Sequence, residues 1–300
     1  AGVPYGAPGA AHAQRRDAGG IGLSKPPKQL IAKRLVDLAL AEDEKRATAL
    51  IMAGQVLVNN QPARPGMRVA PDDQIRLKGV QMPYLAKGGL KLAGALSAFQ
   101  VDPAGRVCLD AGASAGGFTD CLLKHGAEKV YAVDVGFGQL LGSLRQNPRV
   151  VNLERTNLSS PSLLALDPRP GLATCDLSYL SLREAVPVYR DILGWEGELI
   201  CLVKPLFEVD DALARRTGQI APDAYAPMLR DLAAYLNSRP GVRVMDVCLS
   251  PVTGHAGTVE FFFHVVFSSL LEAPALDAAI DRSVALAAAR KRDQTENGDV

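Results

Sequence analysis

The sequence predicts an α/β protein: a mostly parallel β-sheet with helices on both faces, preceded by a smaller α+β region. Seven short apolar runs recur through the last two thirds of the chain, and most are separated by amphipathic segments with helical spacing. Strand–helix alternation of this kind forms parallel sheets whose faces are covered by helices. The chain has 300 residues, 48% hydrophobic and 22% charged, which suffices for one large domain and one small one.

The first segment, residues 1–28, is rich in Gly, Ala and Pro and has almost no large apolar residue, so we expect a disordered tail. No apolar run in the chain approaches the roughly 20 residues that cross a bilayer, and no signal-peptide pattern opens it. None of the five cysteines forms a C-x-x-C pair, which argues against a zinc site or a disulfide framework. We therefore expect a cytoplasmic protein with no metal and no membrane partner.

Residues 29–80 are predicted to fold as a compact unit of two helices followed by short strands. The segments "QLIAKRLVDLALAED" (29–43) and "EDEKRATALIMAGQ" (42–55) have helical spacing of their apolar residues. The next segment, "VLVNNQPA" (56–63), alternates and contains the hairpin signal Asn59-Asn60, and "PDDQIRLKG" (71–79) adds a turn and a strand.

This unit is basic, with twelve Lys/Arg and six Asp/Glu over residues 25–91, whereas residues 92–300 have a net charge of −6. Such a distribution indicates a module that binds a polyanion, although chance segregation of charge is the alternative. The core at 41–69 resembles the S-four-type RNA-binding domain, in which the second helix and the following hairpin face structured RNA. The resemblance implies contacts to RNA phosphates from Lys33, Arg34, Lys45, Arg46, Arg64 and Arg68.

After an expected linker at 81–91, residues 92–270 are predicted to form the sheet domain, and 271–300 a C-terminal helix and tail. The expected strands are 105–110, 129–134, 150–154, 172–176, 198–204, 242–248 and 258–266. Helices are expected at "SLREAVPVYRDIL" (181–193), "DAYAPMLRDLAAYLN" (223–237) and "ALDAAIDRSVALAAARKR" (275–292).

A glycine-rich loop follows the first of these strands, in "RVCLDAGASAGGFTDCLL" (106–123). It has no Lys after its glycines, as a P-loop requires, and its G-x-x-x-G-G spacing differs from the dinucleotide fingerprint. Asp110 at the strand end would repel a pyrophosphate and suits a zwitterionic ligand such as the amino-acid end of S-adenosylmethionine. The candidate cofactor-binding residues in this segment are Asp110, Gly112, Ser114, Gly116, Gly117 and Phe118.

The next two strands supply two further cofactor candidates. Asp134 ends its strand where a carboxylate can accept hydrogen bonds from both ribose hydroxyls, and Asn157 follows the third strand within reach of an adenine edge. A strand, an acid, a glycine loop and a second acid, in this order, are typical of Rossmann-type methyltransferases that use S-adenosylmethionine. Tight packing alone is the alternative explanation for the glycines.

Polar residues at the ends of apolar strands are the candidate catalytic groups. Asp176 ends the fourth strand, Lys204 ends the fifth and Glu260 lies in the last one. A buried lysine is costly unless its charge is used or its pKa is lowered, so we expect these three side chains to meet in one crevice at the carboxyl edge. Lys87 and Lys91 precede the sheet domain, and for Lys87 a snorkelling or paired charge is the better interpretation.

Taken together, these motifs resemble the TlyA family, which joins an S-four domain to an FtsJ-like methyltransferase domain. Members of this family are described both as haemolysins and as ribosomal RNA 2′-O-methyltransferases. The matching segments are "KGGLKL", "LDAGASAGGFTDCLL", "KVYAVDVGFGQL", "RVVNLERTN", "DLSYLSL", "LVKPLFEV" and "GTVEFF". The Lys-Asp-Lys-Glu tetrad of FtsJ-type enzymes falls on Lys91, Asp176, Lys204 and Glu260.

The resemblance implies S-adenosylmethionine-dependent 2′-O-methylation of cytidine in 16S or 23S rRNA, with ribosomal RNA or ribosomal subunits as partner. Three features depart from the family: Ala115 replaces Thr, Lys87 replaces Arg, and the loop "DDALARRTGQIAPDAY" follows "LFEV". The alternatives are a non-catalytic RNA-binding assembly factor and a haemolysin or pore-forming protein.

Overall fold

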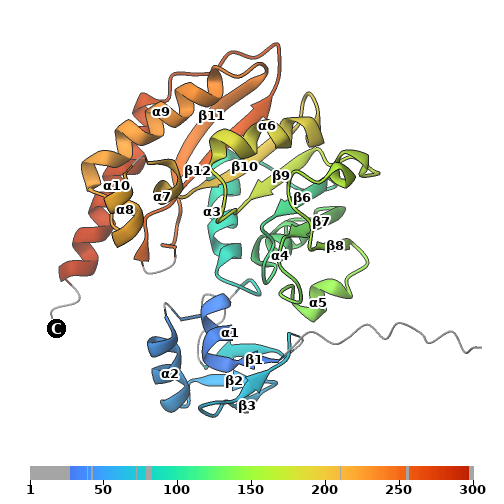
Figure 1. Cartoon of the computed structure of the whole chain (residues 1–300), viewed down its shortest axis with the longest axis vertical. Helices are drawn as coiled ribbons and strands as arrows, with labels where there is room; N and C mark the ends of the chain where they lie inside the picture. Colours follow the sequence, from blue (N-terminus) through green and yellow to red (C-terminus); the bar gives the residue numbers. More distant parts are fainter. Residues whose placement is uncertain are drawn as a thin grey trace, which may run out of the picture.

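The computed structural model of the chain describes residues 28–38, 40–41, 43–71, 73–78, 83–209, 211–254 and 257–296. They form a small body from the N-terminal part of the chain and a large body that holds the main sheet (Figure 1). The expected tail lies outside the described residues except for Lys28, as do residues 81 and 82 of the expected linker.

The small body has two helices, α1 (Ile31–Asp37) and α2 (Glu44–Met52). Its strands are β1 (Gln29–Leu30) paired with β4 (Arg68–Val69), and the three-stranded sheet β3 (Gln61–Pro62), β2 (Val56–Val58) and β5 (Ile75–Leu77). The side chain of Asp43 caps α2 by accepting a hydrogen bond from the backbone N of Arg46 at 2.6 Å. The predicted Asn59-Asn60 turn joins β2 to β3, with φ of 49° and 66°.

The large body is built on a seven-stranded sheet in the order β11-β12-β10-β9-β6-β7-β8. The strands are β6 (Val107–Ala111), β7 (Lys129–Asp134), β8 (Val150–Glu154), β9 (Leu172–Cys175), β10 (Glu198–Val203), β11 (Val242–Leu249) and β12 (Phe261–Phe267). Neighbours from β8 to β10 are parallel, whereas β12 is antiparallel to both β10 and β11. The predicted mostly parallel α/β sheet is confirmed.

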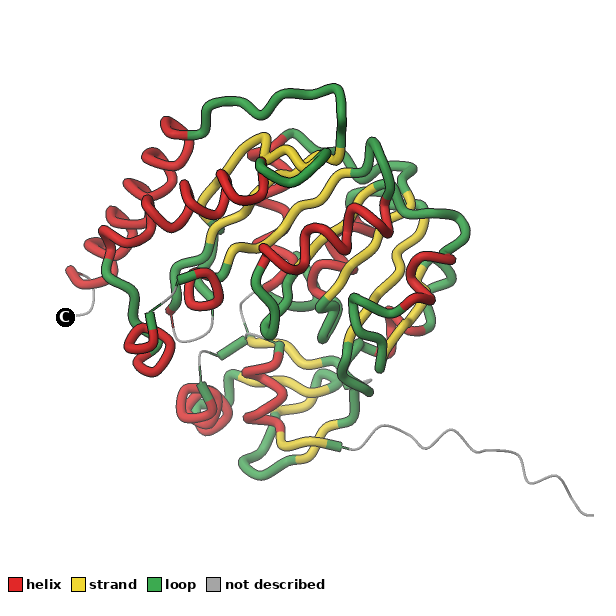
Figure 2. Tube along the Cα trace, turned by 45° about the horizontal axis from the view of Figure 1, so that its top comes forward, coloured by secondary structure: helices red, strands yellow, loops and turns green. Residues whose placement is uncertain are grey.

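Helices cover both faces of this sheet (Figure 2). One face is packed against α3 (Gly88–Phe99), α4 (Gly117–Lys124) and α5 (Gly142–Arg145). The other face is packed against α6 (Leu182–Leu193), α9 (Tyr225–Asn237) and α10 (Asp277–Glu296). The short helices α7 (Pro205–Glu208) and α8 (Ala212–Thr217) follow β10, and 3₁₀ turns occur at Pro161–Ala165 and Pro222–Ala224. Helix α3 begins inside the stretch expected to be a linker, so Lys91 lies on a helix.

The strand order reverses between β6 and β9. On one side of β6 lie β7 and then β8, and on its other side lie β9 and then β10. Open α/β sheets bind ligands at the carboxyl ends of the strands beside such a reversal. The glycine loop follows β6 and Asp176 follows β9, so both lie at this point. Among the described residues, no helix has the length and apolar character needed to cross a membrane.

The two bodies are joined by a small apolar cluster at the end of α1. Leu38 packs there with Ala86, Ala115 and Leu141 of the large body. Ala115 is only 3% exposed, so its small side chain is part of this contact. The backbone N of Lys87 also donates a hydrogen bond to the carbonyl oxygen of Leu38 at 3.4 Å.

Arg34 strengthens the same junction, and its burial argues against the RNA-phosphate contact that the sequence predicts for it. Its side chain is buried, with 3% exposure, on the face of α1 that packs inward. The guanidinium donates hydrogen bonds to the carbonyl oxygen of Gln139, at 3.4 Å, and to that of Pro71, at 3.3 Å. A buried guanidinium that binds backbone carbonyls cannot also reach an RNA phosphate.

Candidate active site

The glycine loop between β6 and α4 needs conformations that only glycine adopts easily. Gly112 and Gly116 have φ of +84° and +95°. A Cβ atom added to Gly112 would lie 2.3 Å from the carbonyl oxygen of Asp176, and one added to Gly116 would lie 2.1 Å from Cδ1 of Leu144. The loop is therefore pressed against the end of β9 on one side and against α5 on the other.

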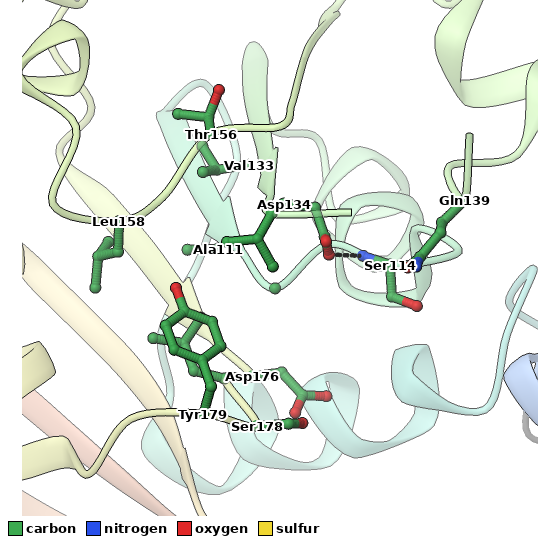
Figure 3. Close-up of a pocket in the computed structure, with 13 residues that line it drawn as sticks. Ala111, Ser114, Val133, Asp134, Gln139, Thr156, Leu158, Asp176, Ser178 and Tyr179 are labelled. Carbon is green, nitrogen blue, oxygen red and sulfur yellow. Dashed lines mark hydrogen bonds between the residues drawn. The ribbon is translucent and has the colours of Figure 1, made fainter. Parts of the chain in front are cut away.

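A cavity of about 210 Å³ lies beside this loop, at the carboxyl ends of β6, β7 and β9 (Figure 3). Asp134 lies on its wall and points toward the glycine loop. The Oδ2 atom of Asp134 accepts a hydrogen bond from the backbone N of Ser114 at 2.8 Å, and Oδ1 accepts one from the backbone N of Gly136 at 2.7 Å. One carboxylate thus ties the loop after β6 to the loop after β7 and keeps lone pairs for a ligand.

Several lining residues of this cavity were not predicted from the sequence. Val133, Val135, Leu158 and Tyr179 give it apolar walls, while Thr156 and Gln139 add polar groups. Asn157, the predicted adenine contact, does not line the cavity although both of its neighbours do. Its Oδ1 instead accepts hydrogen bonds from the backbone N and the hydroxyl of Ser159, at 3.0 and 2.9 Å. An Asx-type turn has the same sequence signature as a ligand contact, so only the fold separates them.

A second cavity of about 130 Å³ lies on the other side of the glycine loop. It shares Gly112, Ser114 and Asp176 with the first cavity. The rest of its wall comes from the glycine loop, from α3 and from the small body: Ala113, Ala115, Gly117, Phe118, Gly88, Lys91, Ala86, Asp37 and Leu38. A ligand larger than either cavity can therefore occupy both of them across Ser114.

The four predicted catalytic residues form two ion pairs close to these cavities. The Nζ atom of Lys204 lies 2.5 Å from Oδ1 of Asp176, and Nζ of Lys91 lies 2.5 Å from Oε2 of Glu260. Lys204 also donates a hydrogen bond to the hydroxyl of Ser178 at 2.8 Å. Glu260 and Lys91 are more deeply buried than Asp176 and Lys204, with side-chain exposures of 6%, 11%, 24% and 18%.

The charges of the four groups act on one another. Burial alone would raise the pKa of Asp176, but Lys204 and Lys91 lower it below its ordinary value. Burial alone would lower the pKa of Lys204, but Asp176, and then Glu260, raise it. Lys204 is therefore a cation at neutral pH, and its ammonium is suited to stabilise a developing negative charge rather than to remove a proton.

Burial raises the pKa of Glu260 above its ordinary value, although Lys91 opposes this. Glu260 accepts a hydrogen bond from the Lys91 ammonium. It lies just before β12, and this antiparallel strand starts beside the carboxyl end of its neighbour β10. This direction of β12 brings Glu260 to the same edge as Asp176 and Lys204.

Asp110, the predicted contact to a cationic ligand, lies in neither cavity wall. It is fully buried and accepts hydrogen bonds from the hydroxyls of Thr119, at 2.6 Å, and Thr174, at 3.0 Å. These threonines belong to α4 and β9, so the carboxylate connects the helix after the glycine loop to the strand before Asp176. We assign Asp110 a positioning role in place of the expected direct contact.

The buried Asp110 gives a pH-dependent prediction. Burial raises its pKa from 3.8 to about 6, against the hydrogen bonds from the two threonines. The folded state therefore binds a proton more tightly than the unfolded state, and this group lowers the free energy of unfolding as pH rises from about 4 to 6, by about 3 kcal/mol in all. We expect Asp110→Asn to remove this contribution, so that the difference between wild-type and variant unfolding free energies changes by that amount across the window. Urea unfolding at several pH values measures it, and parallel pH curves for the two proteins would contradict the assignment.

The remaining predicted RNA contacts lie on the surface of the small body. Lys33, Lys45, Arg46, Arg64 and Arg68 are all exposed. Arg76 and Lys78, on and after β5, are exposed basic residues that the sequence analysis did not single out. Arg68 donates a hydrogen bond to the carbonyl oxygen of Lys28 at 2.7 Å, which fixes its position beside β1.

Comparison with known proteins yields matches over both bodies. Residues 84–267 match the family described as FtsJ-like methyltransferase, and residues 31–75 match the S4 domain. The chain is 37% identical over 260 residues to the 16S/23S rRNA (cytidine-2′-O)-methyltransferase TlyA of Mycobacterium tuberculosis, covering 83% of this chain and 95% of the relative. It is 33% identical over 228 residues to Hemolysin A of Brachyspira hyodysenteriae, covering 75% of this chain and 94% of that relative. A solved structure from Streptococcus thermophilus superimposes with a TM-score of 0.76 at 31% identity and covers 90% of this chain and 99% of that one.

Proposed function

The chain belongs to the TlyA family, in which an S4 domain precedes an FtsJ-like methyltransferase domain, and from this premise we propose that it methylates ribose 2′-hydroxyls of ribosomal RNA with S-adenosylmethionine as donor. The observation that supports this most strongly is that two ion pairs, Lys204–Asp176 and Lys91–Glu260, lie beside a cavity suited to adenosine. The S4 domain corresponds to the small body and supplies the RNA-binding surface.

The donor fits the residues that line the two cavities. Asp134 offers carboxylate lone pairs for the ribose hydroxyls, and the apolar wall formed by Val133, Leu158 and Tyr179 suits an adenine ring. Gly112, Ser114, Gly117 and Phe118 line the second cavity, where the amino-acid end would lie. When bound, the sulfonium of the donor supplies an activated methyl group.

Within the tetrad, each residue has a role that follows from its contacts. The proton of the 2′-hydroxyl would pass to solvent water as the oxygen takes up the methyl group. The Lys204 ammonium would stabilise the negative charge that develops on this oxygen, because a fixed positive charge in a partly buried site interacts strongly with a developing alkoxide. Asp176 holds Lys204 in place through their ion pair. Lys91 and Glu260 fix the opposite side of the crevice and would orient the ribose, since alignment supplies a large share of rate enhancement in transfer reactions.

RNA would be held by the exposed basic residues of the S4 domain, Lys33, Lys45, Arg46, Arg64 and Arg68. Contacts of this type position a nucleic acid without reading its sequence. The substrate is then a cytidine in 16S or 23S rRNA, as the name of the Mycobacterium tuberculosis relative states for that protein. We place the reaction on ribosomal subunits in the cytoplasm.

The test uses ribosomal subunits from cells that lack the enzyme, incubated with purified protein and labelled S-adenosylmethionine. We expect label in ribosomal RNA at a position that becomes resistant to alkaline cleavage, because a methylated 2′-oxygen cannot attack the adjacent phosphate. Substrate RNA with a 2′-deoxy sugar at the mapped position is the control and should accept no label. Subunit binding without label would indicate a non-catalytic assembly factor, and lysis of red cells by the purified protein would support the haemolysin alternative.

A further inference from the structure

The second cavity has walls from both domains, and this leads to a proposal that rests on the function proposed above. We infer that Asp37, at the end of α1 in the S4 domain, is the carboxylate that receives the ammonium group of the methyl donor's amino-acid end. The S4 domain would then complete the cofactor site as well as bind RNA.

The position of the cavity supports this inference. Asp37 and Leu38 line it from the S4 domain, together with Ser114 of the glycine loop and Phe118 of α4. The shared lining residues Gly112, Ser114 and Asp176 make it the continuation of the adenosine cavity. A ligand that places its ribose at Asp134 therefore extends past Ser114 toward Asp37.

The carboxylates around the site support the inference independently. An ammonium group needs a negative partner, and three nearby carboxylates are already occupied. Asp110 accepts the hydroxyls of two threonines, Asp176 is paired with Lys204, and Glu260 is paired with Lys91. Asp37 accepts a hydrogen bond from the neutral amide of Gln29 at 2.9 Å and forms no ion pair with another described residue. It is thus the carboxylate of the cavity wall whose charge is not compensated by a cation of the described chain.

The junction between the domains keeps Asp37 at this wall. Leu38, its neighbour, is 2% exposed and packs with Ala86, Ala115 and Leu141. The Lys87–Leu38 backbone hydrogen bond and the contact of Arg34 with the Gln139 carbonyl hold α1 against the methyltransferase domain. Ala115 of the glycine loop therefore packs against the end of the helix that carries Asp37.

The experiment measures binding of two ligands by calorimetry, without RNA and without turnover. The ligands are S-adenosylhomocysteine and its deaminated analogue, which lacks only the amino group. The proteins are wild type, Asp37→Asn and the matched control Glu44→Gln, which removes one exposed carboxylate from the same domain but not from the cavity wall. We expect Asp37→Asn to weaken binding of S-adenosylhomocysteine by about tenfold or more, as for loss of one hydrogen bond to a charged group.

The deaminated analogue distinguishes an ammonium contact from a general change in the site. It should bind wild type and Asp37→Asn equally, and Glu44→Gln should match wild type with both ligands. Equal weakening of both ligands by Asp37→Asn, or no weakening of either, would overturn the assignment of Asp37. If wild type bound neither ligand, the proposed methyltransferase function itself would fail, which is a different result. Asn is nearly isosteric with Asp and the site is exposed, so the variant should unfold at the wild-type temperature.

Discussion

Replacing Lys204 by alanine should lower kcat for methyl transfer to ribosomal subunits by about a thousandfold, the order of magnitude for loss of a fixed group that stabilises transition-state charge. The reason is the ion pair with Asp176 and the raised pKa of Lys204, which together keep an ammonium at the edge of the crevice. Single-turnover transfer with saturating donor measures the chemical step. Binding of S-adenosylhomocysteine should change less than about fivefold, because Lys204 lines neither cavity.

The control for Lys204→Ala is Lys129→Ala. Lys129 begins β7, at the edge of the sheet opposite the crevice, and its ammonium lies 5.8 Å from the ring of Tyr131. The Lys129→Ala variant lacks a lysine of the same domain that does not contact the site, so it should transfer methyl groups at the wild-type rate. A Lys204→Ala protein that kept more than a tenth of wild-type kcat would remove this lysine from the proposed mechanism.

Asp134→Ala is expected to raise the Kd for S-adenosylhomocysteine about a hundredfold. Its two oxygens accept the backbone N–H groups of Ser114 and Gly136, so the variant loses both the shape of the glycine loop and the acceptor for the ribose. The variant would lose the hydrogen bonds from both ribose hydroxyls to the carboxylate. Each hydrogen bond to a charged group contributes about 1.5 kcal/mol or more, so the two together correspond to roughly this factor. Calorimetry gives the Kd, and hydrogen exchange at Ser114 and Gly136 should become faster.

Glu128→Ala is the matched control for Asp134→Ala, because Glu128 is an exposed carboxylate that immediately precedes the first residue of β7, whereas Asp134 is the last residue of this strand. Its Kd should equal that of wild type. If Asp134→Ala bound S-adenosylhomocysteine within threefold of wild type, the first cavity would not be the adenosine site.

The sheet could be predicted closely from sequence because its strands are short apolar runs between amphipathic segments. All seven expected strands are present, and β8, at residues 150–154, has the predicted bounds. The meeting of Asp176 and Lys204 was also predictable, since each follows a parallel strand and the carboxyl ends of parallel strands share an edge. Glu260 joins them only because β12 is antiparallel to β10. The antiparallel direction of β12 was not predictable, because a strand sequence carries no mark of its direction.

The environments of single residues could not be predicted in the same way. Asp110 has the sequence position of a ligand contact, but its partners Thr119 and Thr174 lie 9 and 64 residues away. Arg34 belongs to a basic helix, and only the docking of α1 on the large domain buries it. The pKa of Lys204 depends on burial and on Asp176, which act in opposite directions, so its sign requires the distance between the two charges.

The Lys91–Glu260 ion pair has a consequence for the synthesis of the protein. Its partners are 169 positions apart in the chain, and one lies on the helix that opens the large domain while the other precedes the last strand of the sheet. A nascent chain therefore lacks a complete site until Glu260 has left the ribosome, whereas the S4 domain, at residues 31–75, emerges much earlier. Newly made protein can hold RNA before it can modify it, and the appearance of methyl transfer during synthesis would report insertion of the final strand.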